Sequence, residues 1–196
     1  MIIYNVRDIF RLILRITHIQ PPPVELIDLF NTHNRLVLVY PHTSYWDGMI
    51  MLLYLMAYPK TMRDITFLIR PDLLKIPVVG HFLRYKGALH STPLEIKNGG
   101  YIEHLVRYLN SRDRYQFLIS PKGTVRKSPW RSGWYYITKQ TNSKIACLGF
   151  DYIRRQLMVS EIYNMDELPQ KDELEKTLKM FMKTTNPCNP QNEEYY

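Results

Sequence analysis

The chain has 196 residues, of which 45% are hydrophobic and 13% aromatic, so it can bury a core of its own and is not a disordered polypeptide. It carries 26 Lys and Arg residues against 18 Asp and Glu residues, a formal net charge of +8. This excess predicts attraction to a polyanion: an anionic membrane, a phosphorylated substrate or nucleic acid. Cys147 and Cys188 match neither a C-x-x-C pair nor a zinc spacing, which favours a reducing compartment.

Residues 2–18 have the periodicity of an amphipathic helix. Arg7, Arg11 and Arg15 recur every four residues as one cationic stripe, beside a broad apolar face. Such a helix either lies in a membrane interface, with its arginines reaching the headgroups, or packs on its own domain. The chain contains no run of about 18 uncharged apolar residues and does not open with a secretory signal. We therefore expect any membrane contact to be peripheral, on the cytoplasmic side.

Pro21, Pro22 and Pro23 end this helix and divide the chain into an interfacial helix at 1–20, a folded domain at 24–183 and a mobile tail at 184–196. Within the domain, apolar strand-like runs alternate with helical patterns. The expected strands are 36–40, 64–69, 87–90, 115–120, 145–152 and 156–163, and the expected helices are 44–58, 99–111, 131–141 and 170–183. This alternation predicts a single α/β domain with a mostly parallel sheet flanked by helices.

The segment Pro-His-Thr-Ser-Tyr-Trp-Asp-Gly at 41–48 joins the first expected strand to the first helix of the domain. In α/β folds, such strand-to-helix turns often carry ligands and reacting groups. If His42 lies in the turn and Asp47 in the first helical turn, the carboxylate can orient the imidazole as a general base for a hydroxyl. The same residues also fit a capping box, in which Asp47 pairs with Ser44 and serves only the helix end.

A second segment, residues 120–133, follows the expected strand at 115–120. Gly123 would let backbone N–H groups approach an anion, and Lys122, Arg126, Lys127 and Arg131 place four cations within ten residues. These features suit a phosphate pocket or, equally, a solvated basic loop. Trp130 and Trp134 would also suit single-stranded nucleic acid, but no nucleic-acid-binding signature accompanies them, so we expect no nucleic-acid partner.

Together these segments resemble the glycerophospholipid acyltransferase family, whose best-known members are the 1-acyl-glycerol-3-phosphate acyltransferases. The first block of that family, a His and an Asp separated by four residues, is matched by His42 and Asp47. The second block is a Gly- and Arg-bearing stretch that contacts the phosphate of the acceptor. It is matched by residues 80–88, with Arg84 the best candidate for the Arg. The third block corresponds to Pro-Lys-Gly-Thr at 121–124 and the Trp-x-x-Gly-aromatic pattern that begins at Trp130.

Three departures from the family pattern concern the substrate rather than the base. Lys122 stands where the family has Glu, Val125 where it has Arg, and Ala146-Cys147 where the fourth block has Pro. The family Glu and Arg help to hold the acceptor, so these departures bear on which acceptor is used. Lys122 and Arg126 could supply a phosphate-binding cation in their place.

The resemblance implies an acyltransferase that moves a fatty acyl group from acyl-CoA or acyl carrier protein to a hydroxyl of a glycerophospholipid precursor such as lysophosphatidic acid. It implies no metal and no bound cofactor, and the expected partners are the thioester donor, the lysophospholipid acceptor and an anionic membrane surface. The expected catalytic residues are His42 and Asp47, and the expected substrate-binding residues are Arg84, Lys122, Gly123, Thr124 and Arg126. The alternative is a catalytically silent relative that binds anionic membranes.

Overall fold

The computed structural model describes residues 6–58, 64–69, 71–77, 79–90, 100–164 and 170–192. Its helices are α1 (Val6–Ile16), α2 (Val24–Thr32), α3 (Tyr45–Ala57), α4 (Val79–Tyr85), α6 (Tyr101–Asn110), α7 (Gly133–Gln140) and α8 (Lys171–Thr184), with the 3₁₀ turns η1 (Leu73–Lys75) and η2 (Pro190–Asn192). Its strands are β1 (Arg35–Val39), β2 (Ile65–Ile69), β3 (Ala88–His90), β4 (Tyr115–Ile119), β5 (Lys144–Asp151) and β6 (Gln156–Val159).

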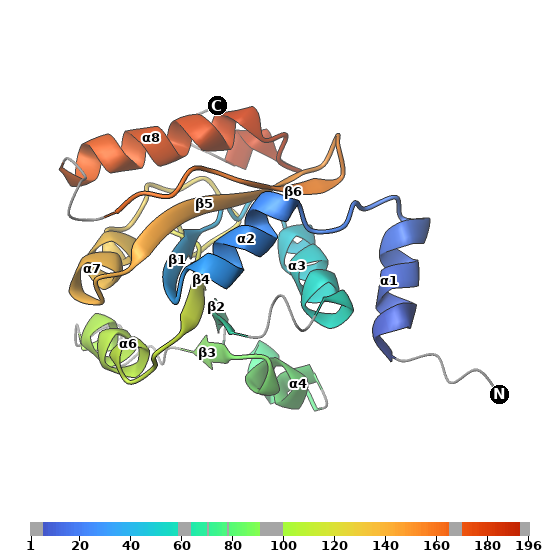
Figure 1. Ribbon diagram of the computed structural model, residues 1–196, viewed down its shortest axis with the longest axis horizontal. Coiled ribbons are helices and arrows are strands. Elements are labelled where there is room, and N and C mark those ends of the chain that lie inside the picture. The colour runs from blue at the N-terminus through green and yellow to red at the C-terminus, as the bar shows by residue number, and fades with distance from the viewer. Residues whose placement is uncertain are drawn as a thin grey trace.

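The six strands form one sheet in the order β3-β2-β4-β1-β5-β6 (Figure 1). The first five are parallel to their neighbours, and β6 returns antiparallel to β5. The central strands β1 and β4 are apolar over almost their whole length because both of their faces are covered by helices. The predicted α/β domain with a mostly parallel sheet is therefore confirmed.

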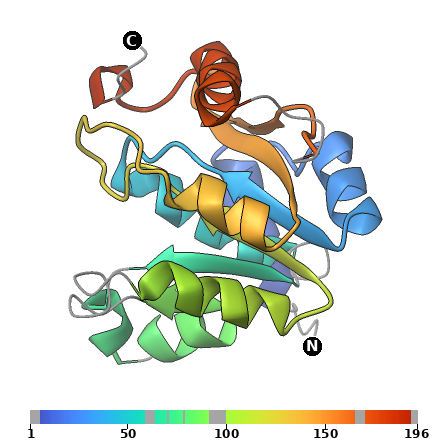
Figure 2. The same ribbon diagram turned by 90° about the vertical axis from the view of Figure 1, so that its left-hand side faces the viewer.

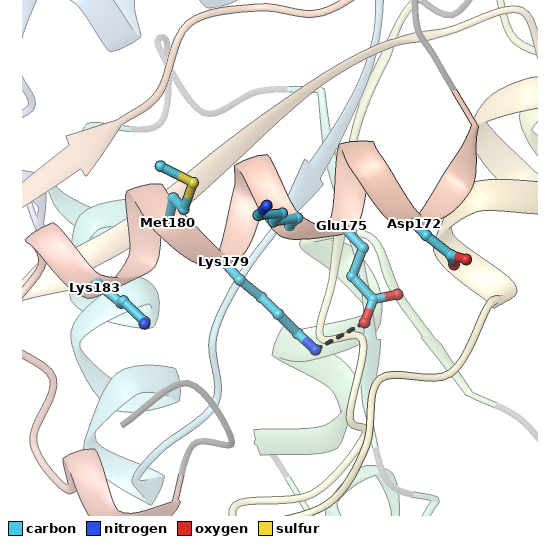
Figure 3. Close-up of a pocket in the computed structure, with 6 residues that line it drawn as sticks. Asp172, Glu175, Lys179, Met180 and Lys183 are labelled. Carbon is cyan, nitrogen blue, oxygen red and sulfur yellow. Dashed lines mark ion pairs between the residues drawn. The ribbon is translucent and has the colours of Figure 1, made fainter.

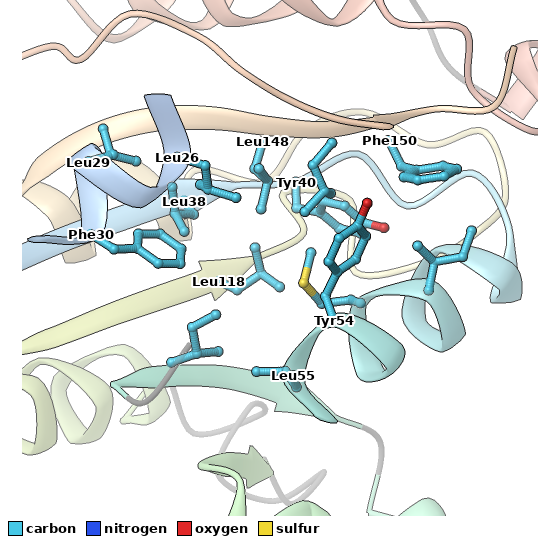
Figure 4. Close-up of a cluster of buried hydrophobic side chains, with 14 of the residues drawn as sticks. Leu26, Leu29, Phe30, Leu38, Tyr40, Tyr54, Leu55, Leu118, Leu148 and Phe150 are labelled. Atoms are coloured by element: carbon cyan, nitrogen blue, oxygen red, sulfur yellow. The ribbon is translucent and has the colours of Figure 1, made fainter. Parts of the chain in front are cut away.

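Alternate side chains of the strands enter two separate cores. On one face, Leu38, Leu118 and Leu148 pack against α2 and α3, with Leu26, Phe30 and other apolar side chains around them (Figure 4). On the opposite face, the remaining strand residues pack against α6, α7 and α8. The largest fully buried residues of this second core are Tyr115, Phe117 and Trp134. Helices on both faces of the sheet make three layers (Figures 1 and 2).

Helix α1 packs on the domain through only part of its circumference. Leu14 is buried, and Arg11 donates from Nε to the carbonyl of Ala57 at 3.1 Å while its guanidinium lies over the Tyr58 ring. The opposite side of α1 leaves Ile9, Leu12 and Ile16 exposed. The helix therefore docks beside α3 at the margin of the molecule (Figure 1) and still presents an apolar stripe outward. Among the described residues, no helix is both long and apolar enough to cross a membrane.

Two helices, α2 and α4, were not expected from the sequence. Helix α2 spans only nine residues, and its buried side chains Leu26, Leu29 and Phe30 give one short helical stripe after the proline run. Helix α4 is shorter still, and its Gly80 lies against the carbonyl of Leu74 in η1. Short helices of this kind depend on tertiary packing more than on their own periodicity.

The C-terminal segment differs from the expected mobile tail. Thr185 is buried, and the Nδ2 of Asn186 donates to the buried carboxylate of Asp151 at 2.8 Å. The backbone N–H of Tyr152 in turn donates to the carbonyl of Asn186. Its Asn- and Pro-rich composition suggested mobility, but its amide side chains find acceptors on the domain. Residues 193–196 lie outside the described residues.

Candidate active site

The candidate site lies at the carboxyl ends of β1 and β4. From β1 the chain passes into α3 on one face of the sheet, and from β4 it passes toward α7 on the other. Adjacent strands whose connections leave to opposite faces form a switch point, where α/β folds bind ligands. His42 follows β1 and Lys122 follows β4, so the two predicted segments meet at this edge.

The turn after β1 is held by a capping box. Ser44 is the N-cap of α3, and its backbone N–H donates to Oδ2 of Asp47 at 2.8 Å. The same oxygen accepts the backbone N–H of Thr43 at 2.7 Å and lies 3.3 Å from the Thr43 hydroxyl. Asp47 is 3% exposed, so these bonds hold its charge in a nearly water-free position.

His42 lies directly beside this carboxylate. Its Nδ1 is 3.7 Å from Oδ2 of Asp47, too far for a hydrogen bond, and is buried without a hydrogen-bond partner among the described residues. The side chain as a whole is 28% exposed, which leaves the Nε2 edge as the reachable part of the ring. The structure thus brings together the two residues predicted to be catalytic, and it also contains the capping box that was the alternative explanation.

Two tyrosines, absent from the sequence-based prediction, complete the surroundings of Asp47. The hydroxyl of Tyr152, just after β5, donates to Oδ1 of Asp47 at 2.5 Å. Burial, together with this bond to Asp47, raises the pKa of Tyr152 above its usual value. Burial and the nearby carboxylate of Asp47 likewise raise the pKa of Tyr40. Both phenols therefore stay protonated at neutral pH.

The loop after β4 is held both by hydrogen bonds within it and by a contact with the C-terminal segment. Lys122 is 1% exposed, and its ammonium donates to the carbonyl of Asn192 at 2.9 Å. Gly123 has a φ of +66°, and its N–H donates to the carbonyl of Ser120. The hydroxyl of Thr124 accepts the backbone N–H of Arg126, whose side chain is exposed. Of the predicted cations, Arg126 is thus reachable from outside, whereas Lys122 lies beneath the C-terminal segment.

That C-terminal segment contacts both predicted blocks. The Nδ2 atoms of Asn189 and Asn192 donate to the carbonyl of Thr43 at 3.2 and 3.0 Å. With the bond from Lys122, the η2 turn links the turn after β1 to the loop after β4. Figure 2 shows η2, in dark red, beside the yellow loop that contains Lys122. The two bonds to Thr43 join positions 146 and 149 residues apart, and the bond from Lys122 joins positions 70 residues apart. None of these contacts had a signal in the sequence.

Arg84 is not brought to this edge of the sheet. It is an exposed residue in the last turn of α4, which leads into the start of β3. There Gly87 lies against the carbonyl of Ile65, the first residue of β2. Because β2 and β3 run parallel in the same sheet as β1, their beginnings lie at the edge opposite His42. The structure therefore gives Arg84 no contact with the candidate site.

Two surface cavities lie on the described part of the molecule, and neither is lined by His42 or Asp47. One, of about 420 Å³, is a shallow hollow along α8 (Figure 3), and its lining residues are Asp172, Glu175, Lys176, Lys179, Met180 and Lys183. It contains none of the predicted site residues. The other, of about 320 Å³, lies between Tyr152 and the C-terminal segment that includes Asn186 and Cys188. Among the described residues, no group of three His, Cys, Asp or Glu side chains is placed to hold a metal ion.

A His beside a buried Asp at the switch point of a parallel sheet is an arrangement that α/β enzymes use for general base chemistry. The model of the family described as Acyltransferase matches residues 22–152. This range includes His42, Asp47 and the loop after β4. The chain belongs to this acyltransferase family, and the family relationship predicted from the sequence blocks is confirmed.

The fold is also similar to the crystal structure of the 1-acyl-sn-glycerophosphate (LPA) acyltransferase PlsC from Thermotoga maritima, with a TM-score of 0.55 and 15% sequence identity. The match covers 77% of this chain and 64% of PlsC, so the chain spans less than two thirds of that protein. At this identity the likeness concerns the fold. No curated protein matches the chain by sequence.

Proposed function

We propose that this acyltransferase transfers a fatty acyl group from a thioester donor, acyl-CoA or acyl carrier protein, to a hydroxyl of a lysophospholipid, with His42 as general base. The geometry of His42 carries the proposal. Its Nδ1 is buried 3.7 Å from a carboxylate, while the side chain as a whole is partly exposed. Hydrogen bonds of this kind are often long in the absence of substrate and shorten when it binds.

In the proposed reaction, Nε2 of His42 takes the proton of the acceptor hydroxyl as the hydroxyl oxygen attacks the thioester carbonyl. The C–O bond of the new ester forms, the C–S bond breaks, and the proton passes from the imidazolium to the departing thiolate. Asp47 stabilises the transient imidazolium through Nδ1 and fixes the ring orientation. The reaction needs no covalent enzyme intermediate, because the acceptor is itself the nucleophile.

Two observations support the proposed acceptor class: the cationic side chains near His42 and the structural similarity to PlsC. Arg126, Lys127 and Arg131 are exposed in the loop that follows β4, at the same sheet edge as His42. An exposed cationic loop beside a general base suits a phosphorylated acceptor. PlsC is named for its action on 1-acyl-sn-glycerophosphate, and we propose an acceptor of that class here. Gly123 and Thr124 would shape this loop, and Arg126 would contact the phosphate. Lys122 could do so only if the C-terminal segment that buries it moved away.

We further propose that the enzyme works peripherally at the cytoplasmic side of an anionic membrane, from which it would take its lysophospholipid acceptor. The observation in favour is the exposed stripe of Ile9, Leu12 and Ile16 on α1, next to the cationic residues of the same helix. The same stripe would serve the alternative, a catalytically silent relative that only binds membranes.

The test of the catalytic assignment is thiol release from long-chain acyl-CoA, with and without lysophosphatidic acid, by wild type and His42→Ala. A positioned general base contributes about 10²–10⁴-fold, so turnover should fall by that order. His104→Ala, which removes an exposed histidine from α6 on the opposite face of the sheet, is the matched control. Near-normal turnover of His42→Ala would refute the role of His42. A wild type that binds vesicles but shows no release with any lysolipid would favour the silent relative.

A further inference from the structure

The two oxygens of the Asp47 carboxylate have different partners. Oδ2 receives the N–H groups of Thr43 and Ser44 and faces His42. Oδ1 takes no part in the helix cap and instead accepts the hydroxyl of Tyr152 at 2.5 Å. A carboxylate that served only the helix end would not need a second oxygen fixed by a residue 105 positions away in the sequence.

The Tyr152 ring is itself held in place. It packs edge-on against Phe150, with ring centroids 5.0 Å apart and an interplanar angle of 87°. Its backbone N–H donates to the carbonyl of Asn186, so the C-terminal segment fixes the chain at this point. The hydroxyl therefore reaches Oδ1 of Asp47 from the end of β5, a different element from the one that carries the helix cap.

We infer that Tyr152 is a positioning residue that acts on His42 through Asp47, an inference that rests on the proposed acyl transfer. With both oxygens bonded, the carboxylate cannot rotate about its Cβ–Cγ bond, and Oδ2 stays directed at Nδ1 of His42. Without the hydroxyl, Oδ1 would be left buried and unpaired. The carboxylate would then turn toward other donors, and the imidazole would lose its fixed orientation.

Two features of the surroundings support this assignment. The raised pKa of Tyr152 keeps its hydroxyl protonated, so it remains a donor over the whole neutral range. The titratable groups that face the pair are Tyr40, whose pKa is raised in part by Asp47, and Cys188, which interacts electrostatically with Tyr152. At neutral pH both tyrosines are therefore protonated, so neither places a negative charge beside Asp47.

The kinetic test compares wild type with Tyr152→Phe, which keeps the ring and removes only the hydroxyl. A hydrogen bond to a charged group typically changes an equilibrium or rate by about 10- to 100-fold, so kcat should fall by that order. The KM for lysophosphatidic acid should stay within about twofold, because Tyr152 is not assigned to the acceptor. Tyr115→Phe is the matched control. Its hydroxyl makes a bond of the same 2.5 Å length to Ser143, but at the opposite edge of the sheet, and its kcat should not change.

A double-mutant cycle separates action through Asp47 from a general effect on the fold. If Tyr152 acts through Asp47, then Tyr152→Phe should have no further effect on kcat when Asp47 is already Asn. Equal losses in both backgrounds, or an unchanged kcat in the single variant, would overturn the inference.

A second readout does not depend on catalysis. The imidazole NMR resonances of His42, assigned by their loss in His42→Ala, should shift in Tyr152→Phe and stay unchanged in Tyr115→Phe. If the wild type proved inactive but these resonances still shifted, the proposed function would fail and the positioning role would stand. Unshifted His42 resonances would refute the positioning role, whatever the activity.

Discussion

At the scale of single residues, Asp47 caps a helix and also lies beside His42, two arrangements that the sequence presented as alternatives. Its Oδ2 accepts the backbone N–H groups of Thr43 and Ser44 and lies 3.7 Å from Nδ1 of His42. A carboxylate has about four lone-pair sites, so capping a helix does not prevent it from orienting an imidazole. Capping also attaches the carboxylate to the rigid start of α3, which a positioning group requires.

Gly87 allows a stability prediction at the same scale. It has a φ of +87°, and a Cβ at this position would lie 2.3 Å from the carbonyl oxygen of Ile65. Gly87→Ala should therefore strain the backbone where β3 joins β2 and lower the free energy of unfolding by at least about 1–3 kcal/mol. Urea denaturation followed by circular dichroism measures the change.

Gly48 provides the matched control for that measurement. It lies inside α3, and a Cβ added there would meet no atom within 4 Å. Gly48→Ala should raise the free energy of unfolding by roughly 0.5–1 kcal/mol, because alanine loses less backbone entropy in a helix. If both variants were equally stable, the close approach of Gly87 to Ile65 would not exist in solution.

At the scale of elements, α1 packs on the domain and also exposes an apolar stripe, so its packing leaves a face free for a membrane. We predict that replacing Ile9, Leu12 and Ile16 together with Ser weakens binding to anionic phospholipid vesicles by roughly 100-fold, through lost apolar insertion. The thermal unfolding midpoint should barely move, because these side chains are exposed. Vesicle co-sedimentation and a melting curve measure the two quantities.

The control for α1 removes apolar side chains from elsewhere on the surface. Tyr136 in α7 and Met180 in α8 are 50% and 60% exposed, on the face of the sheet opposite to α1. Replacing both with Ser should leave vesicle binding unchanged. Undiminished binding by the α1 variant would mean that the membrane contacts a different surface.

At the scale of the whole molecule, the C-terminal segment ties together parts of the chain that are distant in sequence. Asn189 and Asn192 both donate to the carbonyl of Thr43, beside the candidate base. Replacing both with Ala should remove about 1–2 kcal/mol of stability and lower the melting temperature by roughly 2–8 °C. Turnover should fall as well, because the turn that carries His42 loses its support. Differential scanning calorimetry and the thiol-release assay measure these effects.

Asn31 is the corresponding control, because it is exposed in α2, the helix that precedes β1, and not in the turn after β1. Asn31→Ala should leave melting temperature and turnover close to those of wild type. If the double variant behaved like Asn31→Ala, the segment would not be docked on the domain in solution, and the mobile tail expected from its composition would be the better description.

Much of the fold followed from local patterns. The apolar runs of β1, β4 and β5 and the capping box of α3 lie within one or two residues of their predicted positions, because burial on both faces and a helix cap each leave a local signature. The strand predicted at 156–163 is shorter: β6 ends at Val159, and Tyr163 makes only an isolated bridge to Ile145. Helices α2 and α4 were missed because each is short and depends on neighbours for its burial.

The sequence by itself determined the α/β class, the family blocks and the pairing of His42 with Asp47, since all of these are encoded in short stretches of chain. Only the tertiary structure decided that Tyr152 and the C-terminal asparagines reach the same turn, that Lys122 lies buried beneath Asn192, and that Arg84 lies at the opposite edge of the sheet. The physical reason is that strand order and crossover connections, which no local pattern reports, determine which strand ends become neighbours.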